Sequence, residues 1–181
     1  MLASSAQDHA LVQLNSAYPI RLWDPIGSAP IRLVPATIPT ILVFLSPECP
    51  MSVSYTRTLT QIQYDFHSAI QIFAIVPGST YTDEKVRKFY KEYGLTFPIY
   101  TDRKLQLAKK MKATVTPEVF LFNTTGKLVY RGAIDDWLQE LGKKKTKPEQ
   151  HYLRDAILQC LNGQPVALSY VTPQGCLIND F

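Results

Sequence analysis

Two apolar runs constrain the fold most, because each is typical of a β-strand that is buried on both faces. They span residues 40–45 and 70–76, and Pro77-Gly78 closes the second run. Between them, apolar residues recur at steps of four, three and four, which predicts the apolar stripe of a helix: Tyr55, Leu59, Ile62 and Phe66. A strand, a helix and a strand in this order are typical of an α/β domain.

The rest of the pattern extends this unit. Strands are predicted at residues 19–23 and 31–34, around a turn at 24–27, at 97–100, and at 118–122 and 127–131, which flank a hairpin turn at 123–126. Helices are predicted around residues 86–93, 105–111 and 153–161, and Gly94 and Gly163 end the first and the last of these. The order predicts a central mixed β-sheet with helices on both faces.

Composition supports a folded domain and excludes other classes of protein. Of the 181 residues, 46% are apolar and 19% are charged, which allows a sizeable core. No unbroken apolar stretch is longer than five residues, so no transmembrane helix is predicted. The net charge of +4 is partly local, in Lys143, Lys144, Lys145 and Lys147, and differs from the broad basic face of a nucleic-acid binder.

The first ten residues show neither the charged region nor the apolar region of a signal peptide, so none is predicted. The same sequence also fits a mature secreted chain to which an initiator methionine has been added. Both interpretations stay open on the sequence alone.

Cys49 is the main candidate for chemistry, because it lies where a buried strand ends and a helix is predicted to begin. The unpaired N–H groups and the dipole of a helix N-terminus favour a thiolate, and Pro50 suits the first helical turn. Glu48 opposes this effect, since a neighbouring carboxylate raises the pKa of a thiol. The alternative is a buried, inert thiol; we favour the reactive one.

The other two cysteines have different settings. Cys160 shares the apolar face of the last predicted helix with Ala156 and Ile157, so we expect a small core residue. Cys176 lies in a tail without periodicity, and it is either incidental or a thiol that reaches a distant partner. Sequence separation alone does not decide whether it reaches Cys49.

Two further patterns, Thr116-Pro117 and Asp135-Asp136, each have a structural as well as a functional interpretation. Thr116-Pro117 precedes the strand at 118–122, and its proline is either a residue tolerated at a strand edge or a cis-proline beside the reactive thiol. Asp135 and Asp136 are either an acidic pair near a site or part of a solvated loop, and we expect the solvated loop. The histidines are scattered, with no Cys or His at metal-ligand spacing, so no metal and no other cofactor is predicted.

Several segments together resemble the thioredoxin-like superfamily, and within it the redoxin or peroxiredoxin-like group of thiol-disulfide isomerases. They are the strand at 40–45, Glu48-Cys49-Pro50-Met51-Ser52, Thr116-Pro117-Glu118-Val119-Phe120, Tyr130-Arg131-Gly132, and the closing stretch from Tyr152 through Gly163 to Gly175-Cys176. The resemblance implies a thioredoxin-like α/β fold. It also implies a flexible N-terminal extension (1–17), a thioredoxin-like domain (18–163) and an irregular C-terminal tail (164–181) that packs on or near the domain.

Carried over residue by residue, the resemblance makes Cys49 the first cysteine of a Cys-x-x-Cys motif. It also makes Thr116-Pro117 the cis-proline loop that faces this cysteine. Ser52 stands where the second motif cysteine should be, which excludes two-cysteine chemistry within the motif, although a serine there can still hydrogen-bond the thiolate. Cys176 is then the only plausible resolving thiol in the chain.

The resemblance therefore implies a thiol-disulfide oxidoreductase with a Cys-x-x-Ser site, acting on a protein disulfide or thiol, with no nucleic acid and no membrane span. It slightly favours an extracytoplasmic location. We expect Tyr55 or Trp137 to be exposed near the site and to shape a substrate groove.

Two alternatives stay open. One is a non-catalytic binding module with the thioredoxin fold, which the loss of the second motif cysteine supports. The other is a peroxiredoxin-like thiol peroxidase, an antioxidant protein. Ser46 fits that family's hydroxyl three residues before the cysteine, but Leu42 stands in place of its proline, and Arg131 would have to supply the cation.

Overall fold

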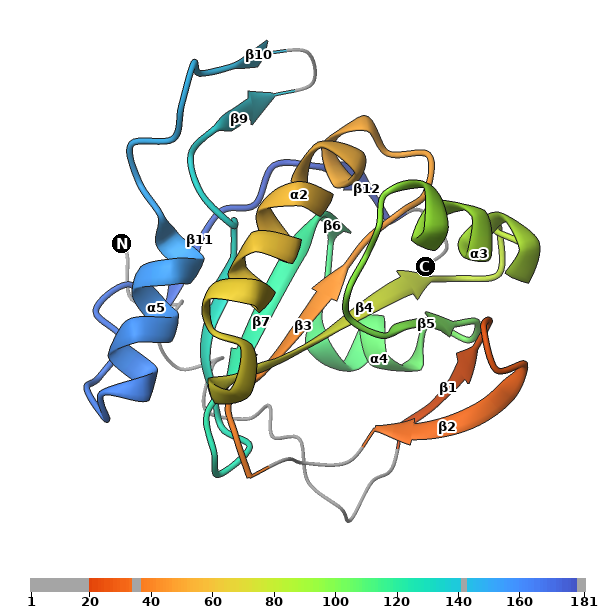
Figure 1. The fold of residues 1–181 in the computed structure, drawn as a ribbon, viewed down its shortest axis with the longest axis horizontal. Coiled ribbons are helices and arrows are strands. Elements are labelled where there is room, and N and C mark those ends of the chain that lie inside the picture. Colours follow the sequence, from red (N-terminus) through yellow and green to blue (C-terminus); the bar gives the residue numbers. More distant parts are fainter. Residues whose placement is uncertain (1–19, 34–36, 141–142, 179–181) are drawn as a thin grey trace.

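The computed structural model describes residues 20–33, 37–140 and 143–178. Its main sheet has eight strands in the spatial order β11-β8-β7-β3-β4-β5-β1-β2 (Figure 1). These strands are β1 (Ile20–Asp24), β2 (Ala29–Leu33), β3 (Thr40–Phe44), β4 (Gln71–Pro77), β5 (Ile99–Asp102), β7 (Glu118–Phe122), β8 (Leu128–Gly132) and β11 (Tyr170–Val171). The helices are α2 (Pro50–Asp65), the short 3₁₀-helix η2 (His67–Ala69), α3 (Asp83–Glu92), α4 (Gln106–Met111) and α5 (Tyr152–Leu161).

The strand directions confirm the predicted mixed sheet. β3, β4 and β5 run parallel to one another, with α2 and α3 in the connections between them. β7 and β8 form the predicted hairpin, and β7 pairs antiparallel with β3. At the hairpin turn, the side-chain oxygen of Asn123 accepts hydrogen bonds from the N–H groups of Thr125 and Lys127, so the asparagine closes the turn.

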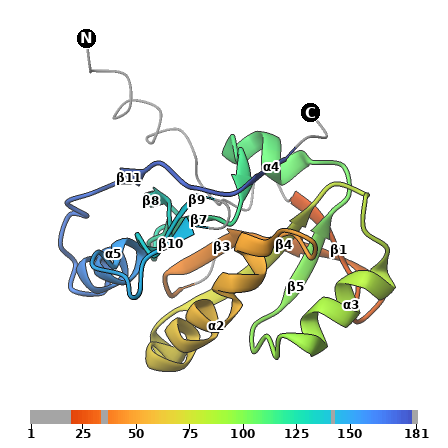
Figure 2. The same ribbon diagram turned by 90° about the horizontal axis from the view of Figure 1, so that it is seen from above.

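Two hydrophobic cores lie on opposite faces of the sheet, because side chains alternate along a strand. In β3, Ile41 and Val43 pack into one core and Leu42 and Phe44 into the other, and all four are fully buried. α2, α3 and α5 pack on the first face and α4 packs on the second (Figure 2). The prediction of helices on both faces is confirmed.

Most predicted elements are present, and their ends shift for local reasons. The strand expected from residue 97 begins at Ile99, directly after Pro98, which has no N–H to donate to a ladder. α3 begins earlier than its apolar stripe, since the Thr82 hydroxyl caps the helix by accepting the N–H of Lys85. The first turn of this helix is polar, so hydrophobic periodicity does not detect it.

Five short strands carry no sequence signal, because segments of two or three residues show no hydrophobic period. One is β11 in the main sheet, and the other four form two small ladders: β6 (Val115–Thr116) with β12 (Cys176–Leu177), and β9 (Leu138–Glu140) with β10 (Lys143–Lys144). Part of the lysine run thus forms a strand. Figure 1 shows the β9–β10 ladder above α5, at one end of the molecule.

The segment after α5 packs against the domain through β11, which pairs in parallel with β8. The two strands approach so closely at Gly132 that an added Cβ would lie 1.8 Å from the Val171 carbonyl oxygen, so only glycine fits there. The predicted N-terminal extension, residues 1–17, lies outside the described residues. In the described part of the chain, no helix has the length and apolar character needed to cross a bilayer.

Candidate functional site

Cys49 lies at the N-terminus of α2, as predicted. It follows β3 by a short loop and is the residue that precedes the first helical residue, Pro50. Its backbone is extended (φ −80°, ψ 115°), and its carbonyl accepts the N–H of Val53 at 3.0 Å in the first helical turn. The residue is only 2% exposed. A thiolate released here would lie beside the free N–H groups and the positive end of the helix dipole.

A disulfide bond joins Cys49 to Cys176, 127 residues later, with a Cα–Cα distance of 6.0 Å. β12 holds Cys176 in place by pairing antiparallel with β6, so that Cys176 lies opposite Thr116. The N–H of Ile178 extends this ladder by donating to the Thr114 carbonyl at 3.0 Å. The tail cysteine is therefore positioned by backbone pairing, which has no signature in the sequence.

The Thr116–Pro117 peptide bond is cis and lies beside the disulfide. The Thr116 carbonyl oxygen is 3.0 Å from Cys49 Sγ, and the Thr116 side chain is buried. Of the two interpretations of this proline, the structure contains the cis-proline next to the cysteine. Cys49, Cys176 and Thr116 together line a cavity of about 340 Å³, which Tyr81 and Leu177 also line.

Ser52 is fully buried and lies in the first turn of α2. Its hydroxyl oxygen accepts the N–H of Ser46 at 3.2 Å, so it ties the start of the helix to the loop that carries Cys49. The Ser46 hydroxyl in turn lies 2.8 Å from the Tyr81 hydroxyl.

Glu48, which we expected to oppose a thiolate at Cys49, forms an ion pair with Lys85. The Lys85 Nζ lies 2.6 Å from Glu48 Oε1, and both side chains are largely exposed. The pKa of Lys85 is raised by this hydrogen bond to Glu48. The negative charge next to Cys49 is thus balanced by a cation from α3.

Glu118 follows the cis-proline and is a fully buried carboxyl group. Its Oε2 accepts the N–H of Thr114 at 2.8 Å, and its Oε1 lies 3.6 Å from a guanidinium nitrogen of Arg131. Burial raises the pKa of Glu118, and the hydrogen bond from Thr114 and the charge of Arg131 offset this only in part. Arg131, considered as a cation for peroxide, thus forms a partly buried ion pair with Glu118.

This raised pKa predicts a pH dependence of stability. The folded state binds a proton at Glu118 that the unfolded state releases, so the free energy of unfolding should fall as the pH rises through the raised pKa. Glu118→Gln should flatten this slope, which urea titrations at a series of pH values from the ordinary pKa of a glutamate upward would measure. Burial also raises the pKa values of Asp102 and Asp135. These two groups contribute to the pH dependence of both proteins, so the difference between the two curves reports Glu118. If the free energy of unfolding depends on pH in the same way in the wild type and in Glu118→Gln, the raised pKa does not belong to Glu118.

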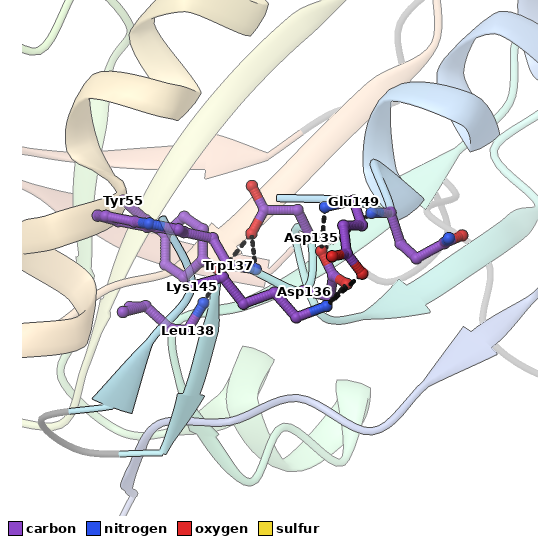
Figure 3. A network of polar contacts seen from close by, with 8 residues as sticks. Tyr55, Asp135, Asp136, Trp137, Leu138, Lys145 and Glu149 are labelled. Atoms are coloured by element: carbon purple, nitrogen blue, oxygen red, sulfur yellow. Dashed lines mark hydrogen bonds and ion pairs between the residues drawn. The ribbon is translucent and has the colours of Figure 1, made fainter. Parts of the chain in front are cut away.

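Asp135 and Asp136 do not lie in a solvated loop, so that expectation is wrong. Asp135 is 6% exposed, and its Oδ1 accepts hydrogen bonds from the Tyr55 hydroxyl at 2.5 Å and from the Trp137 N–H at 2.9 Å (Figure 3). Asp136 binds Lys145 Nζ at 2.6 Å, and this ammonium lies 2.9 Å from Glu149 as well. The β9–β10 ladder and the segment that precedes α5 bring these groups together, which a local sequence pattern does not reveal.

Tyr55 is buried, in contrast to the expectation of an exposed aromatic residue near the site. Its ring packs edge-on against Trp137, which is partly buried, at 5.9 Å between centroids. The reason is the apolar stripe of α2, which directs Tyr55 into the core beside Asp135. Cys160 is a free, half-buried thiol packed against the core, and burial raises its pKa, as suits the predicted core residue.

Nothing in the described ranges suggests a metal centre, since no group of three or more His, Cys, Asp or Glu side chains is placed to hold an ion. The site consists of a thiol pair, a cis-proline segment and two neighbouring cavities.

Solved structures with the same fold include two proteins that match nearly the whole chain. A hypothetical protein from Sinorhizobium meliloti 1021 is 27% identical, with 93% of this chain and 94% of that chain covered and a TM-score of 0.78. An uncharacterized conserved protein from Geobacillus kaustophilus is 26% identical, with coverage of 92% and 90% and a TM-score of 0.77. A secreted Mycobacterium tuberculosis disulfide oxidoreductase homologous to E. coli DsbE is 14% identical, with coverage of 79% and 94% and a TM-score of 0.55, and shares the fold.

A comparison with curated proteins gives no match. The family comparison matches residues 38–140 to Redoxin. This range is more than half of the chain, and it includes Cys49, Ser52, Thr116 and Pro117 but not Cys176. The chain therefore belongs to the Redoxin family and has a thioredoxin-like redox function.

Proposed function

We propose that this protein is a thiol-disulfide oxidoreductase in which Cys49 is the nucleophile and Cys176, from the C-terminal tail, is the resolving thiol. The observation that carries the proposal is the Cys49–Cys176 disulfide at the N-terminus of α2. It supplies the second thiol that the Cys-x-x-Ser motif lacks. A disulfide at this position makes a two-electron cycle possible within one chain.

In the reducing direction, the Cys49 thiolate attacks one sulfur of a substrate disulfide. A Cys49–substrate disulfide forms, and the other substrate sulfur leaves as a thiolate. The Cys176 thiol then loses its proton to solvent and attacks Cys49 Sγ, which forms the Cys49–Cys176 disulfide and releases the second substrate thiolate. Two electrons pass from the two cysteines to the substrate disulfide, and an external thiol must return them to close the cycle.

Ser52 and Thr116-Pro117 act here as positioning residues. The Ser52 hydroxyl oxygen accepts the N–H of Ser46, and this hydrogen bond fixes the loop before Cys49. The Thr116 carbonyl lies against Cys49 Sγ, while the backbone of Thr116 pairs with the strand that carries Cys176. Both sulfurs are thus held by the same short segment, β6.

The substrates we propose are protein disulfides or thiols outside the cytoplasm. The similarity to a secreted disulfide oxidoreductase supports this location, as does a tail disulfide, since disulfides persist in oxidising compartments.

The experiment that tests the function counts thiolates. The fully reduced protein is mixed with a stoichiometric aromatic disulfide whose thiolate absorbs visible light. The wild type should release two thiolates per chain and gain the Cys49–Cys176 disulfide, which non-reducing peptide mapping identifies. Cys176→Ser should release only one and retain the probe on Cys49. Both proteins carry Cys160→Ser so that the third thiol does not contribute.

Other outcomes would replace the proposal. If Cys49 reacts no faster than a free cysteine in a peptide, the protein is better described as a binding module with this fold. If hydrogen peroxide forms the Cys49–Cys176 disulfide much faster than the aromatic disulfide does, the peroxidase alternative takes its place.

A further inference from the structure

A second cavity, of about 350 Å³, lies beside the cis-proline. Pro117 lines it, and so do Thr172 and Gln174, from the segment that leads to Cys176. Because Pro117 directly follows Thr116, whose carbonyl contacts Cys49 Sγ, the cavity lies near the reactive sulfur, although neither cysteine of the disulfide lines it. A polypeptide bonded to Cys49 through its own cysteine would therefore place a neighbouring side chain near this cavity.

Polar and apolar side chains both line this cavity. The lining includes Tyr55, Ile134, Leu138 and Tyr152. Asp135, which also lines the cavity, is 6% exposed, and both of its hydrogen bonds reach the same oxygen, Oδ1. In Figure 3 the other oxygen of this carboxylate points away from these contacts and carries no dashed line. This oxygen is not fully buried, so a donor from a bound molecule can reach it.

The charge at the cavity is negative. Two carboxylates, Asp135 and Asp136, and one ammonium, Lys145, line it. The Lys145 ammonium is held at 2.6 Å by Asp136 and at 2.9 Å by Glu149, so its charge is already shared between two other acids. Burial raises the pKa of Asp135, and the hydrogen bonds from Tyr55 and Trp137 and the charge of His151 act in the opposite direction. A cationic ligand would stabilise the ionised carboxylate in the same way.

We propose that this cavity binds a lysine or arginine side chain of the substrate polypeptide, next to the cysteine that reacts with Cys49, with Asp135 as the specificity-determining residue. This inference rests on the proposed thiol-disulfide exchange at Cys49. The aliphatic stem can pack against the lining side chains of Ile134 and Leu138, and a terminal ammonium or guanidinium group donates to the Asp135 carboxylate. The Redoxin match and the thiol pair do not specify such a preference.

The test compares two symmetrical peptide disulfides, one with lysine on both sides of the cysteine and one with norleucine there. Each rate is divided by the rate of the same peptide with a small free thiol, which removes intrinsic reactivity. The wild type should favour the lysine peptide by about tenfold in kcat/KM, the size expected for one such ion pair. Asp135→Asn should reduce the ratio to about one, whereas Glu84→Gln, which removes an exposed charge on α3 outside the cavity, should leave it unchanged.

The wild-type ratio needs no variant, so the test holds even if Asp135→Asn fails to fold. A ratio near one in the wild type, or an unchanged ratio in a folded Asp135→Asn protein, would overturn the inference. A second readout does not need turnover. The N–H of Trp137 donates to Asp135, so N-acetyl-lysine methylamide bound at Asp135 should quench the fluorescence of Trp137 in the wild type and not in Asp135→Asn. If quenching occurs but neither peptide disulfide is reduced, the proposed function fails and the cation site stands.

Discussion

Cys49→Ser is expected to reduce disulfide turnover by at least about 1,000-fold, because a serine hydroxyl is not ionised at neutral pH and forms no disulfide. Initial rates with a peptide disulfide would measure the loss. The matched control is Cys160→Ser, which removes a half-buried thiol outside the site and should keep the rate within about twofold of the wild type. Retained activity in Cys49→Ser would mean that another thiol is the nucleophile.

The same substitution also removes the disulfide, so an effect on folding must be separated from an effect on chemistry. In the chain-entropy picture, a disulfide that closes a loop of this length stabilises a protein by about 4–5 kcal/mol. Under reducing conditions the wild type lacks this contribution as well. Cys49→Ser and the reduced wild type should therefore unfold at similar urea concentrations. A much lower midpoint for the variant would show that Cys49 contributes to packing beyond the bond.

Gly175→Ala is expected to disfavour the Cys49–Cys176 disulfide by at least about tenfold, because the geometry of a disulfide is demanding. A Cβ on residue 175 would lie 2.4 Å from the Thr116 carbonyl oxygen and 2.7 Å from its carbon. Both atoms belong to the backbone of β6, so β12 would have to move away from it. Equilibration in a buffer of a small thiol and its disulfide, followed by alkylation and mass spectrometry, gives the oxidised fraction.

Leu177→Ala is the matched control for this variant, because it changes the other side of Cys176 at a residue that is 71% exposed. It should leave the oxidised fraction unchanged. Gly175→Ala should keep the first step of the reaction, since Cys49 is untouched, and so release one thiolate quickly and the second slowly. An oxidised fraction of Gly175→Ala equal to that of the wild type would show that Cys176 reaches Cys49 without the β6–β12 ladder.

The architecture was largely predictable, because burial on both faces leaves a clear pattern in the sequence. The runs that became β3 and β4 each contain five consecutive apolar residues, 41–45 and 72–76, and α2 carries its apolar stripe from Tyr55 to Ile62. The same local logic placed Cys49 at a helix N-terminus, since the end of a strand and Pro50 mark that junction. The capped, polar first turn of α3 and the two-residue strands carry no such period, so pattern reasoning did not detect them.

The parts of the site that sequence reasoning missed are those made by contacts between distant segments. Asp135 next to Asp136 has the composition of a solvated loop, and only the packing of α2 against the loop before β9 buries it under Tyr55. The lysine run has the composition of an exposed basic segment, yet Lys145 folds back onto Asp136. These pairs are 80 and 9 residues apart, and neither spacing corresponds to a helix or strand period.

The sequence by itself determined the α/β class, the mixed sheet and the position of Cys49, because hydrophobic periodicity and helix-start chemistry are local properties of the chain. The resemblance made Cys176 the only plausible resolving thiol for Cys49, but the sequence left open whether this tail residue reaches that partner. Only the tertiary structure decided that partner, by pairing two residues of the tail with β6 and so bringing Cys176 to Cys49 across 127 residues. The physical reason is that backbone hydrogen bonds between strands depend on spatial proximity and only weakly on side-chain identity, so the contact that completes the thiol pair has no counterpart in local sequence.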